Sequence, residues 1–158
     1  AKDYWFDNNF RRRFFKNLIN LIPISRKPNP ESLDLDDTMT LSKAFMDLGN
    51  NIIIFPEGSR GEVGKIQRFR KGAVKFSMGL DVPILPAAIM GAEKAWPKGE
   101  KFIKPFPITV KVLPKIDPPK AEELSKTAYN KALSKITKEL EIKISEALKE
   151  LEETKSPD

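Results

Sequence analysis

The sequence predicts an α/β domain, a mixed sheet flanked by helices, and two observations carry this prediction. Apolar stretches rich in β-branched residues and bounded by proline or glycine alternate with stretches whose apolar residues recur at helical spacing. At 158 residues, 40% of them hydrophobic and 32% charged, the chain is long enough for one domain with a core. No run of 18 apolar residues occurs, so no membrane-spanning helix is predicted.

The first predicted element combines aromatic and basic residues between positions 3 and 22. Its apolar residues at helical spacing are Phe10, Phe14, Leu18 and Leu21, with three arginines and Lys16 around them. Two interpretations stay open: a core-facing helix with a solvated basic face, or a helix lying on an anionic membrane surface with its aromatic side chains inserted. Residues 23–26 are expected to form a short strand.

The remaining elements follow from hydrophobic periodicity and from breakers. They are a helix over 33–48, a buried strand over 52–55, a helix over 73–79, an apolar sheet-interior strand over 81–90, an alternating strand over 108–113 and a long amphipathic helix over 121–153. Pro83 and Pro86 belong at the start of their strand or at an irregularity, because proline has no N–H to donate to a neighbouring strand.

Composition limits the chemistry. The sequence contains no cysteine and no histidine, which excludes a thiol nucleophile, a histidine base and any His-ligated metal within these residues. The net charge of +6 is unevenly placed: residues 1–30 hold seven cations against two acids, 31–50 one against five, and 51–80 six against two. Two basic patches separated by an acidic one indicate an anionic partner that is contacted locally.

The stretch from Asn51 to Gly72 is the candidate site, because a glycine-rich polar loop follows its apolar run. A P-loop is excluded by the spacing of Gly58 and Gly64 and by Ile66 after Lys65, and a nucleophile elbow by Ser59 directly following Gly58. What remains is an anion site.

In this interpretation Arg60 is a bidentate donor, the glycines expose backbone N–H groups, and Lys71 or Arg70 adds positive charge. Glu57 either orients the Arg60 guanidinium or accepts a hydroxyl group. A loop held together by a Glu57–Arg60 pair without any ligand is the alternative.

The residues Phe55-Pro56-Glu57-Gly58-Ser59-Arg60 resemble the FPEGTR signature of the glycerolipid acyltransferases, typified by 1-acylglycerol-3-phosphate (lysophosphatidate) acyltransferase. Three further blocks match in the correct order: the arginine-bearing block at 23–26, the F-K-x-G step at 69–72 and the V-P-[IV]-x-P block at 82–86. The resemblance implies an acyltransferase-like α/β domain over residues 1–118, similar to glycerol-3-phosphate acyltransferase, with residues 119–158 as its C-terminal amphipathic helix.

The resemblance also implies a function in phospholipid biosynthesis. The family transfers an acyl group from acyl-CoA or acyl-carrier protein, as co-substrate and without a cofactor, to the hydroxyl of a glycerophosphate at a membrane surface. The predicted substrate-binding residues are Glu57, Gly58, Ser59, Arg60, Lys71 and Arg26, with Arg60 on the acceptor phosphate. The partners are then the membrane surface and an anionic lysophospholipid, with no nucleic acid, and the location is peripheral, on the cytoplasmic side.

Two departures from the family are visible. Ser59 replaces its threonine and keeps the hydroxyl, whereas the family's histidine base, followed four residues later by an aspartate, has no counterpart in the sequence. Losing such a base removes a contribution of roughly 10²–10⁴-fold. We therefore expect a fragment without the N-terminal catalytic block, inactive alone and with no catalytic residue of its own. The alternatives are a non-catalytic anionic-lipid-binding relative and a basic nucleic-acid-binding domain.

Overall fold

The computed structural model describes residues 35–58, 65–97, 100 and 102–155 and divides the chain into two compact units, 1–53 and 54–158. The helix expected over 3–22 and the strand expected over 23–26 lie outside the described residues. The predicted division at residue 118 stays a prediction. Among the described residues, no helix combines the length and the apolar character needed to cross a bilayer.

In the first unit the structure describes helix α3, Leu35–Asp47, which confirms the helix expected over 33–48. Asp36 and Asp37 occupy its first turn, where negative charge favours the helix dipole. Gly49 follows the helix at φ +82°, and its N–H donates to the Met46 carbonyl at 2.8 Å. A glycine in this left-handed conformation ends the helix without a steric penalty, as the sequence predicted.

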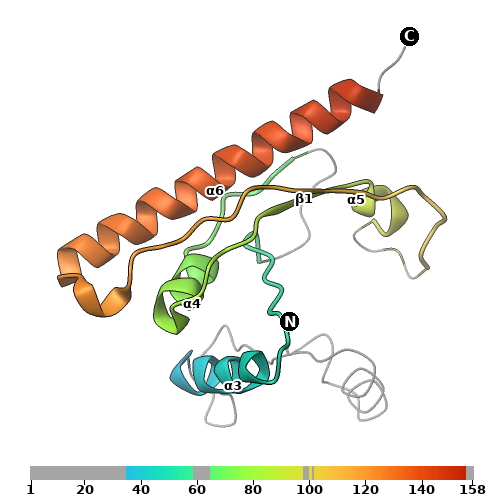
Figure 1. Cartoon of the computed structure of the whole chain (residues 1–158). Coiled ribbons are helices and arrows are strands. Elements are labelled where there is room, and N and C mark those ends of the chain that lie inside the picture. Colours follow the sequence, from blue (N-terminus) through green and yellow to red (C-terminus); the bar gives the residue numbers. More distant parts are fainter. Residues whose placement is uncertain (1–34, 59–64, 98–99, 101, 156–158) are drawn as a thin grey trace. The chain divides into compact units, whose positions relative to one another are not determined.

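The second unit is α/β, which confirms the predicted class. Its described elements are α4 (Gly72–Leu80), β1 (Ala87–Met90), α5 (Ala92–Ala95), β2 (Thr109–Val112), the 3-10 helix η1 (Ala121–Glu123) and α6 (Lys126–Lys155). The described sheet is an antiparallel pair in which Ala87 lies opposite Val112 and Met90 opposite Thr109. Helix α6 packs along β1 and also contacts α4 (Figure 1).

The strand prediction for residues 81–90 was too long. Pro83 and Pro86 interrupt the pairing, so that only an isolated bridge between Ile84 and Ile116 precedes β1. Between this bridge and the Ala87–Val112 pair, one strand advances three residues, from Ile84 to Ala87. The other advances four, from Val112 to Ile116. One extra residue is thus accommodated, as in a β-bulge. Every second residue from Leu85 to Ile89 is exposed, so the strand is not sheet-interior.

The buried strand expected over 52–55 was wrong. These residues carry no strand assignment, and the side chains of Ile53 and Phe55 are 81% and 69% exposed. A β-branched run favours extended backbone, but a strand also needs a neighbour to take its hydrogen bonds. No described residue pairs with this run in a ladder.

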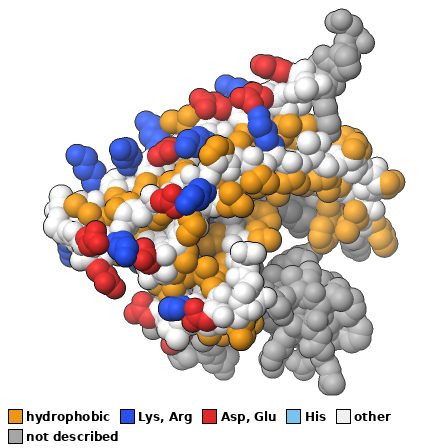
Figure 2. All heavy atoms as spheres, viewed as in Figure 1, with side chains coloured by type: hydrophobic (Ala, Val, Ile, Leu, Met, Phe, Trp, Pro, Cys, Tyr) orange, Lys and Arg blue, Asp and Glu red, His pale blue; other side chains and the backbone are white. Residues whose placement is uncertain are grey.

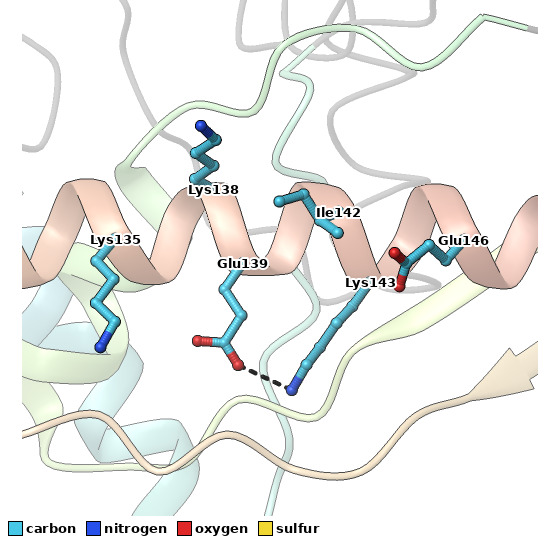
Figure 3. Close-up of a pocket in the computed structure, with 6 residues that line it drawn as sticks. All are labelled: Lys135, Lys138, Glu139, Ile142, Lys143 and Glu146. Atoms are coloured by element: carbon cyan, nitrogen blue, oxygen red, sulfur yellow. Dashed lines mark ion pairs between the residues drawn. The ribbon is translucent and has the colours of Figure 1, made fainter.

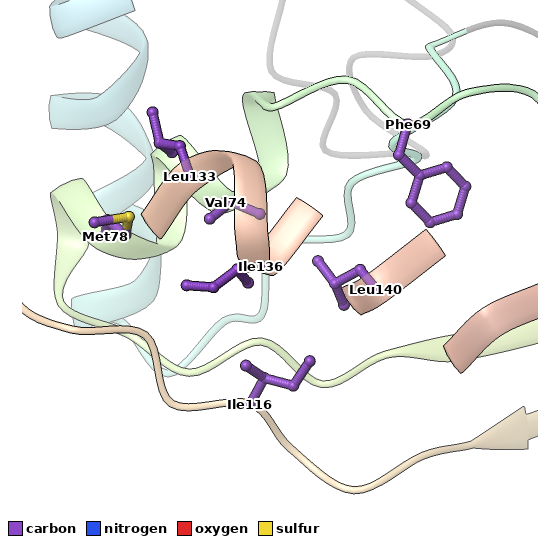
Figure 4. Packing of buried hydrophobic residues seen from close by; sticks show 7 residues of the cluster. All are labelled: Phe69, Val74, Met78, Ile116, Leu133, Ile136 and Leu140. Carbon is purple, nitrogen blue, oxygen red and sulfur yellow. The ribbon is translucent and has the colours of Figure 1, made fainter. Parts of the chain in front are cut away.

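The long C-terminal helix is confirmed, with a break near its predicted start. Leu124 is extended, at φ −109° and ψ 137°, and separates η1 from α6. Ser125 caps α6, because its Oγ accepts a hydrogen bond from the Ala128 N–H at 3.3 Å. One face of α6 then enters the core, whose buried members are Phe69, Val74, Met78, Ile116, Leu133, Ile136 and Leu140 (Figure 4).

Candidate functional site

The signature residues form a turn. The Gly58 N–H donates to the Phe55 carbonyl at 3.1 Å, which closes a four-residue β-turn with Pro56 at its second position. Proline suits that position because its ring fixes φ near the value the turn needs, and glycine is favoured at the fourth. The Pro-Glu-Gly order of the signature therefore has a local structural reason that is independent of any ligand.

Glycine is required at position 58 for two further reasons. Its φ of +72° lies in the left-handed region, and a Cβ there would be 3.0 Å from Nε of Arg70. The Arg70 side chain thus packs directly against the Gly58 backbone, although it lies twelve positions later. Any other residue at position 58 would be strained and would displace this guanidinium group.

Two hydrogen bonds hold together the segments on either side of residues 59–64. The Arg70 N–H donates to the Pro56 carbonyl at 2.9 Å, and the Gln67 N–H donates to Glu57 Oε2 at 2.9 Å. Glu57 is half-buried, so a charged acceptor here stabilises the loop more than an exposed one would. The ends of the predicted anion loop are therefore fixed relative to each other.

Helix α6 fixes the segment that follows the loop. Glu141 Oε2 accepts a hydrogen bond from the Phe69 N–H at 2.8 Å, and the Phe69 side chain is buried in the core. Two residues later, Lys71 Nζ donates to Ser134 Oγ at 2.8 Å. Lys71 also precedes α4, whose buried residues pack on the same core. Residues 69–71 are thus fixed by their contacts with α6 and by the start of α4 at Gly72.

The structure brings three of the six predicted site residues into one described region. Glu57 and Gly58 belong to the turn. Lys71 directly follows Arg70, whose N–H donates to the Pro56 carbonyl, and Lys71 contacts α6. Ser59, Arg60 and Arg26 lie outside the described residues, and their binding roles stay predictions. The described partner of Glu57 is the Gln67 N–H, so its predicted role toward Arg60 or a hydroxyl group is untested.

Sequence reasoning missed Gln67, Ser134 and Glu141. Gln67 carried no signal, because it acts through its backbone N–H. Ser134 and Glu141 lie more than 60 positions from their partners, and on a helix rich in lysine and glutamate nothing sets them apart. Their spacing of seven residues places both on one face of α6, a clue that becomes useful only once the partner segment is known.

Other described features do not form a second site of this kind. No group of three or more Asp or Glu side chains that would suit a metal ion occurs in the described part of the chain. An open depression on α6 is lined by Lys135, Lys138, Glu139, Ile142, Lys143 and Glu146 (Figure 3). Glu139 and Lys143 pair with each other across 2.8 Å, and the lining includes two glutamates, which does not suit an anionic headgroup.

Comparison with models of protein families identifies the family of this chain. The model of the family described as Acyltransferase matches residues 1–90, which include the turn, the predicted anion loop and the α4 segment. The chain belongs to the acyltransferase family. The resemblance drawn from Phe55–Arg60 and its flanking blocks is thereby confirmed.

Three relatives show how much of an acyltransferase the match covers. All three carry the name 1-acyl-sn-glycerol-3-phosphate acyltransferase, which confirms the prediction that the chain belongs to a family of enzymes. The protein of Limnanthes douglasii is 42% identical over 67 residues, 42% of this chain and 24% of its own length. The protein of Cocos nucifera is 33% identical over 85 residues, which are 54% of this chain and 27% of that protein. The protein of Borreliella burgdorferi is 31% identical over 94 residues, which are 59% of this chain and 38% of that protein. The chain thus spans about a quarter of the length of the plant relatives.

A solved structure supports the fold. The crystal structure of the 1-acyl-sn-glycerophosphate (LPA) acyltransferase PlsC from Thermotoga maritima superposes with a TM-score of 0.61. It is 21% identical, and the match covers 90% of this acyltransferase-family chain and 52% of that protein. At this identity the likeness establishes the fold, and it confirms the predicted acyltransferase-like α/β class.

Proposed function

We propose that these 158 residues hold the acceptor-binding part of an enzyme of phospholipid biosynthesis that acylates the hydroxyl of a (1-acyl-)glycerol-3-phosphate. The observation that carries the proposal is the turn at Phe55–Gly58, where the family signature coincides with a loop whose two ends are hydrogen-bonded to each other. The names of the relatives support a lysophosphatidate-type acceptor.

In the proposed site, Arg60 and Lys71 bind the acceptor phosphate. A guanidinium group offers two parallel N–H donors to phosphate oxygens, and an ammonium group adds a flexible point charge. The Pro56–Arg70 and Glu57–Gln67 hydrogen bonds join the two described segments between which Arg60 lies in the sequence. Arg26 contributes a further cation in this proposal, and Ser59 a hydroxyl group.

The acyl donor in the proposal is acyl-CoA or acyl-carrier protein, and the general base comes from outside these residues. Because the sequence contains no histidine, an imidazole base has to be supplied by another segment. We further propose that the protein works as a peripheral enzyme at the cytoplasmic side of a membrane, where its lipid acceptor is found.

Measurement of acyl transfer and of acceptor binding together tests this function. We expect the 158 residues to bind glycerol 3-phosphate saturably but to transfer no acyl group from acyl-CoA. A longer version that carries a histidine, followed four residues later by an aspartate, ahead of Ala1 should transfer the acyl group. A chain that binds neither glycerol 3-phosphate nor lysophosphatidate would show that the loop is not an acceptor site.

A second candidate function is anionic-lipid binding without turnover, which the absence of histidine favours. It predicts the same acceptor binding but no gain of transfer in the longer version. The transfer assay therefore separates the two functions, whereas the binding assay tests the site that they share.

A further inference from the structure

The guanidinium group of Arg70 lies against the backbone of the signature turn. A Cβ built on Gly58 would be 3.0 Å from Arg70 Nε, 3.2 Å from its Cδ and 3.5 Å from its Cζ. Glycine leaves room for this approach, because it carries no side chain. Gly58 is also the last described residue before the predicted anion loop at 59–64. The charged end of Arg70 therefore lies where this loop begins.

The starting point of the Arg70 side chain is fixed as well. The Arg70 N–H donates to the Pro56 carbonyl at 2.9 Å, which ties its backbone to the turn. The preceding residue, Phe69, is buried in the core and donates its N–H to Glu141 of α6 at 2.8 Å. A side chain that is held in place before a ligand arrives loses less conformational entropy when the ligand binds. Arg70 is thus preorganised at the turn.

The positive charge of Arg70 has no acidic partner in the part of the chain that the structure describes. Residues 65–71 contain four cations and no acid. Glu57, the acid of the turn, accepts a hydrogen bond from a backbone N–H instead. On α6, by contrast, lysine and glutamate side chains are intermixed, as Figure 2 shows, and Glu139 pairs with Lys143 at 2.8 Å. The charge at the turn is therefore available to an anion from solution.

Lys71, the neighbouring cation, is directed to a different partner. Its Nζ donates to Ser134 Oγ of α6 at 2.8 Å, whereas the Arg70 side chain packs on the turn. Arg68, two positions before Arg70, is exposed. The sequence allowed either Lys71 or Arg70 to add charge to the anion site, and the described contacts favour Arg70.

We propose that Arg70 is a further ligand of the acceptor phosphate and that position 58 is glycine partly to admit its guanidinium group. This group offers two parallel N–H donors to phosphate oxygens, a geometry that an ammonium group does not offer. Gly58 supplies the room and Arg70 the charge, so the two residues act as a pair. The inference rests on the proposed function, because the phosphate of a (1-acyl-)glycerol-3-phosphate is the anion that would reach this turn.

Calorimetric titration of the chain with glycerol 3-phosphate and with inorganic phosphate measures the role of Arg70. Arg70→Met keeps an unbranched side chain that packs on Gly58 but removes the charge, and it should lower the affinity for both ligands about tenfold or more. Its melting temperature should change by less than about 4 °C, which separates lost binding from lost packing. Arg68→Met, the same change at an exposed arginine, should keep both affinities within about threefold. Arg70→Gln is the uncharged variant to measure if Arg70→Met does not fold.

A double-mutant cycle tests the link between the two residues. Gly58→Ala should weaken phosphate binding in the unchanged chain, because the new methyl group meets the Arg70 side chain. In the Arg70→Met chain the same change should cause a loss at least about threefold smaller, because the charge that it displaces is already gone. Losses that multiply without coupling would contradict the proposed pair.

The outcomes separate this inference from the proposed function. Unchanged affinities in Arg70→Met, or an equal loss in Arg68→Met, overturn the role of Arg70, and the acceptor site stands if Arg60→Ala still weakens glycerol 3-phosphate binding. Lost phosphate binding in Arg70→Met, in a chain that binds glycerol 3-phosphate no more tightly than inorganic phosphate, keeps Arg70 as an anion ligand but contradicts the acceptor function. An unchanged chain that binds neither ligand overturns both.

Discussion

Glu141 of α6 accepts a hydrogen bond from the backbone N–H of Phe69 at 2.8 Å, although 72 positions separate the two residues. Phe69 lies directly before the basic pair Arg70 and Lys71, so this bond connects the C-terminal helix to the predicted anion site. The family model ends at residue 90, so this contribution of α6 comes from a part of the chain that the model does not match.

Replacing Glu141 should therefore affect both stability and acceptor binding. Glu141→Ala leaves the Phe69 N–H without its charged acceptor and should cost about 1–3 kcal/mol. Glu141→Gln keeps a carbonyl acceptor and should cost less. Urea unfolding measures the stability, and titration with glycerol 3-phosphate measures the affinity, which should fall several-fold in Glu141→Ala. Glu146→Ala, an exposed change on the same helix, is the control, and equal behaviour of both alanine variants would contradict this role.

Gly58→Ala should be destabilising for a reason that lies in the backbone. A non-glycine residue at φ +72° costs about 1–3 kcal/mol, and the new methyl group would also meet the Arg70 side chain at 3.0 Å. Gly72→Ala is the matched control, because a Cβ at that helical position meets nothing within 4 Å. Thermal unfolding should show a clear loss for the first change only. Equal melting temperatures would mean that the turn is not formed as described.

Lys71 has one described contact and one proposed role, and substitution can separate them. Its ammonium group donates to Ser134 Oγ at 2.8 Å on the surface, where such a bond contributes less than about 1 kcal/mol. Ser134→Ala should therefore change stability little and leave acceptor affinity intact. Lys71→Ala should weaken acceptor binding several-fold, because it removes a cation from the proposed phosphate site. If Lys71→Ala and Ser134→Ala bind the acceptor equally, the role of Lys71 is confined to the helix contact.

The buried face of α6 should carry much of the stability of the second unit. Leu140 is buried in the core together with Phe69 and Ile136, and Leu140→Ala should cost about 2–5 kcal/mol (Figure 4). Ile142 lies two positions on and is exposed, so Ile142→Ala should cost less than about 1 kcal/mol. Denaturant unfolding of the two variants measures the difference. Similar midpoints would contradict the packing of α6.

Hydrophobic periodicity was sufficient for the helices and insufficient for the strands. Helices α4 and α6 bury apolar residues of their own sequence, so a local pattern defines them. Helix α3 forms where the pattern predicts it, although its fully buried side chains are the polar Thr38 and Ser42. The run Ile52–Phe55 has the composition of a strand, but pairing depends on a neighbour that the sequence of the run does not contain. Pro86 shortened β1 for a local reason that was visible in advance, whereas the bulge opposite it depended on the register with Ile116.

The candidate site was predictable to a similar degree. The signature located Glu57 and Gly58, and the geometry of the turn explains why those residue types occur there. The bonds from α6 to residues 69–71 were not predictable, because Glu141 and Ser134 resemble every other polar residue on that helix. Long-range contacts between a charged side chain and a backbone N–H leave no periodic trace in a sequence.

The most direct test of the central claim is the affinity of the chain for glycerol 3-phosphate with and without Arg60. We expect Arg60→Ala to lower the affinity at least about tenfold, because a bidentate charge-assisted contact with phosphate is lost. Arg68→Ala, which removes a neighbouring cation from the same basic cluster, should stay within about threefold of the unchanged chain. Unaltered affinity in Arg60→Ala, or an equal loss in Arg68→Ala, would contradict the claim that this loop specifically binds the acceptor phosphate.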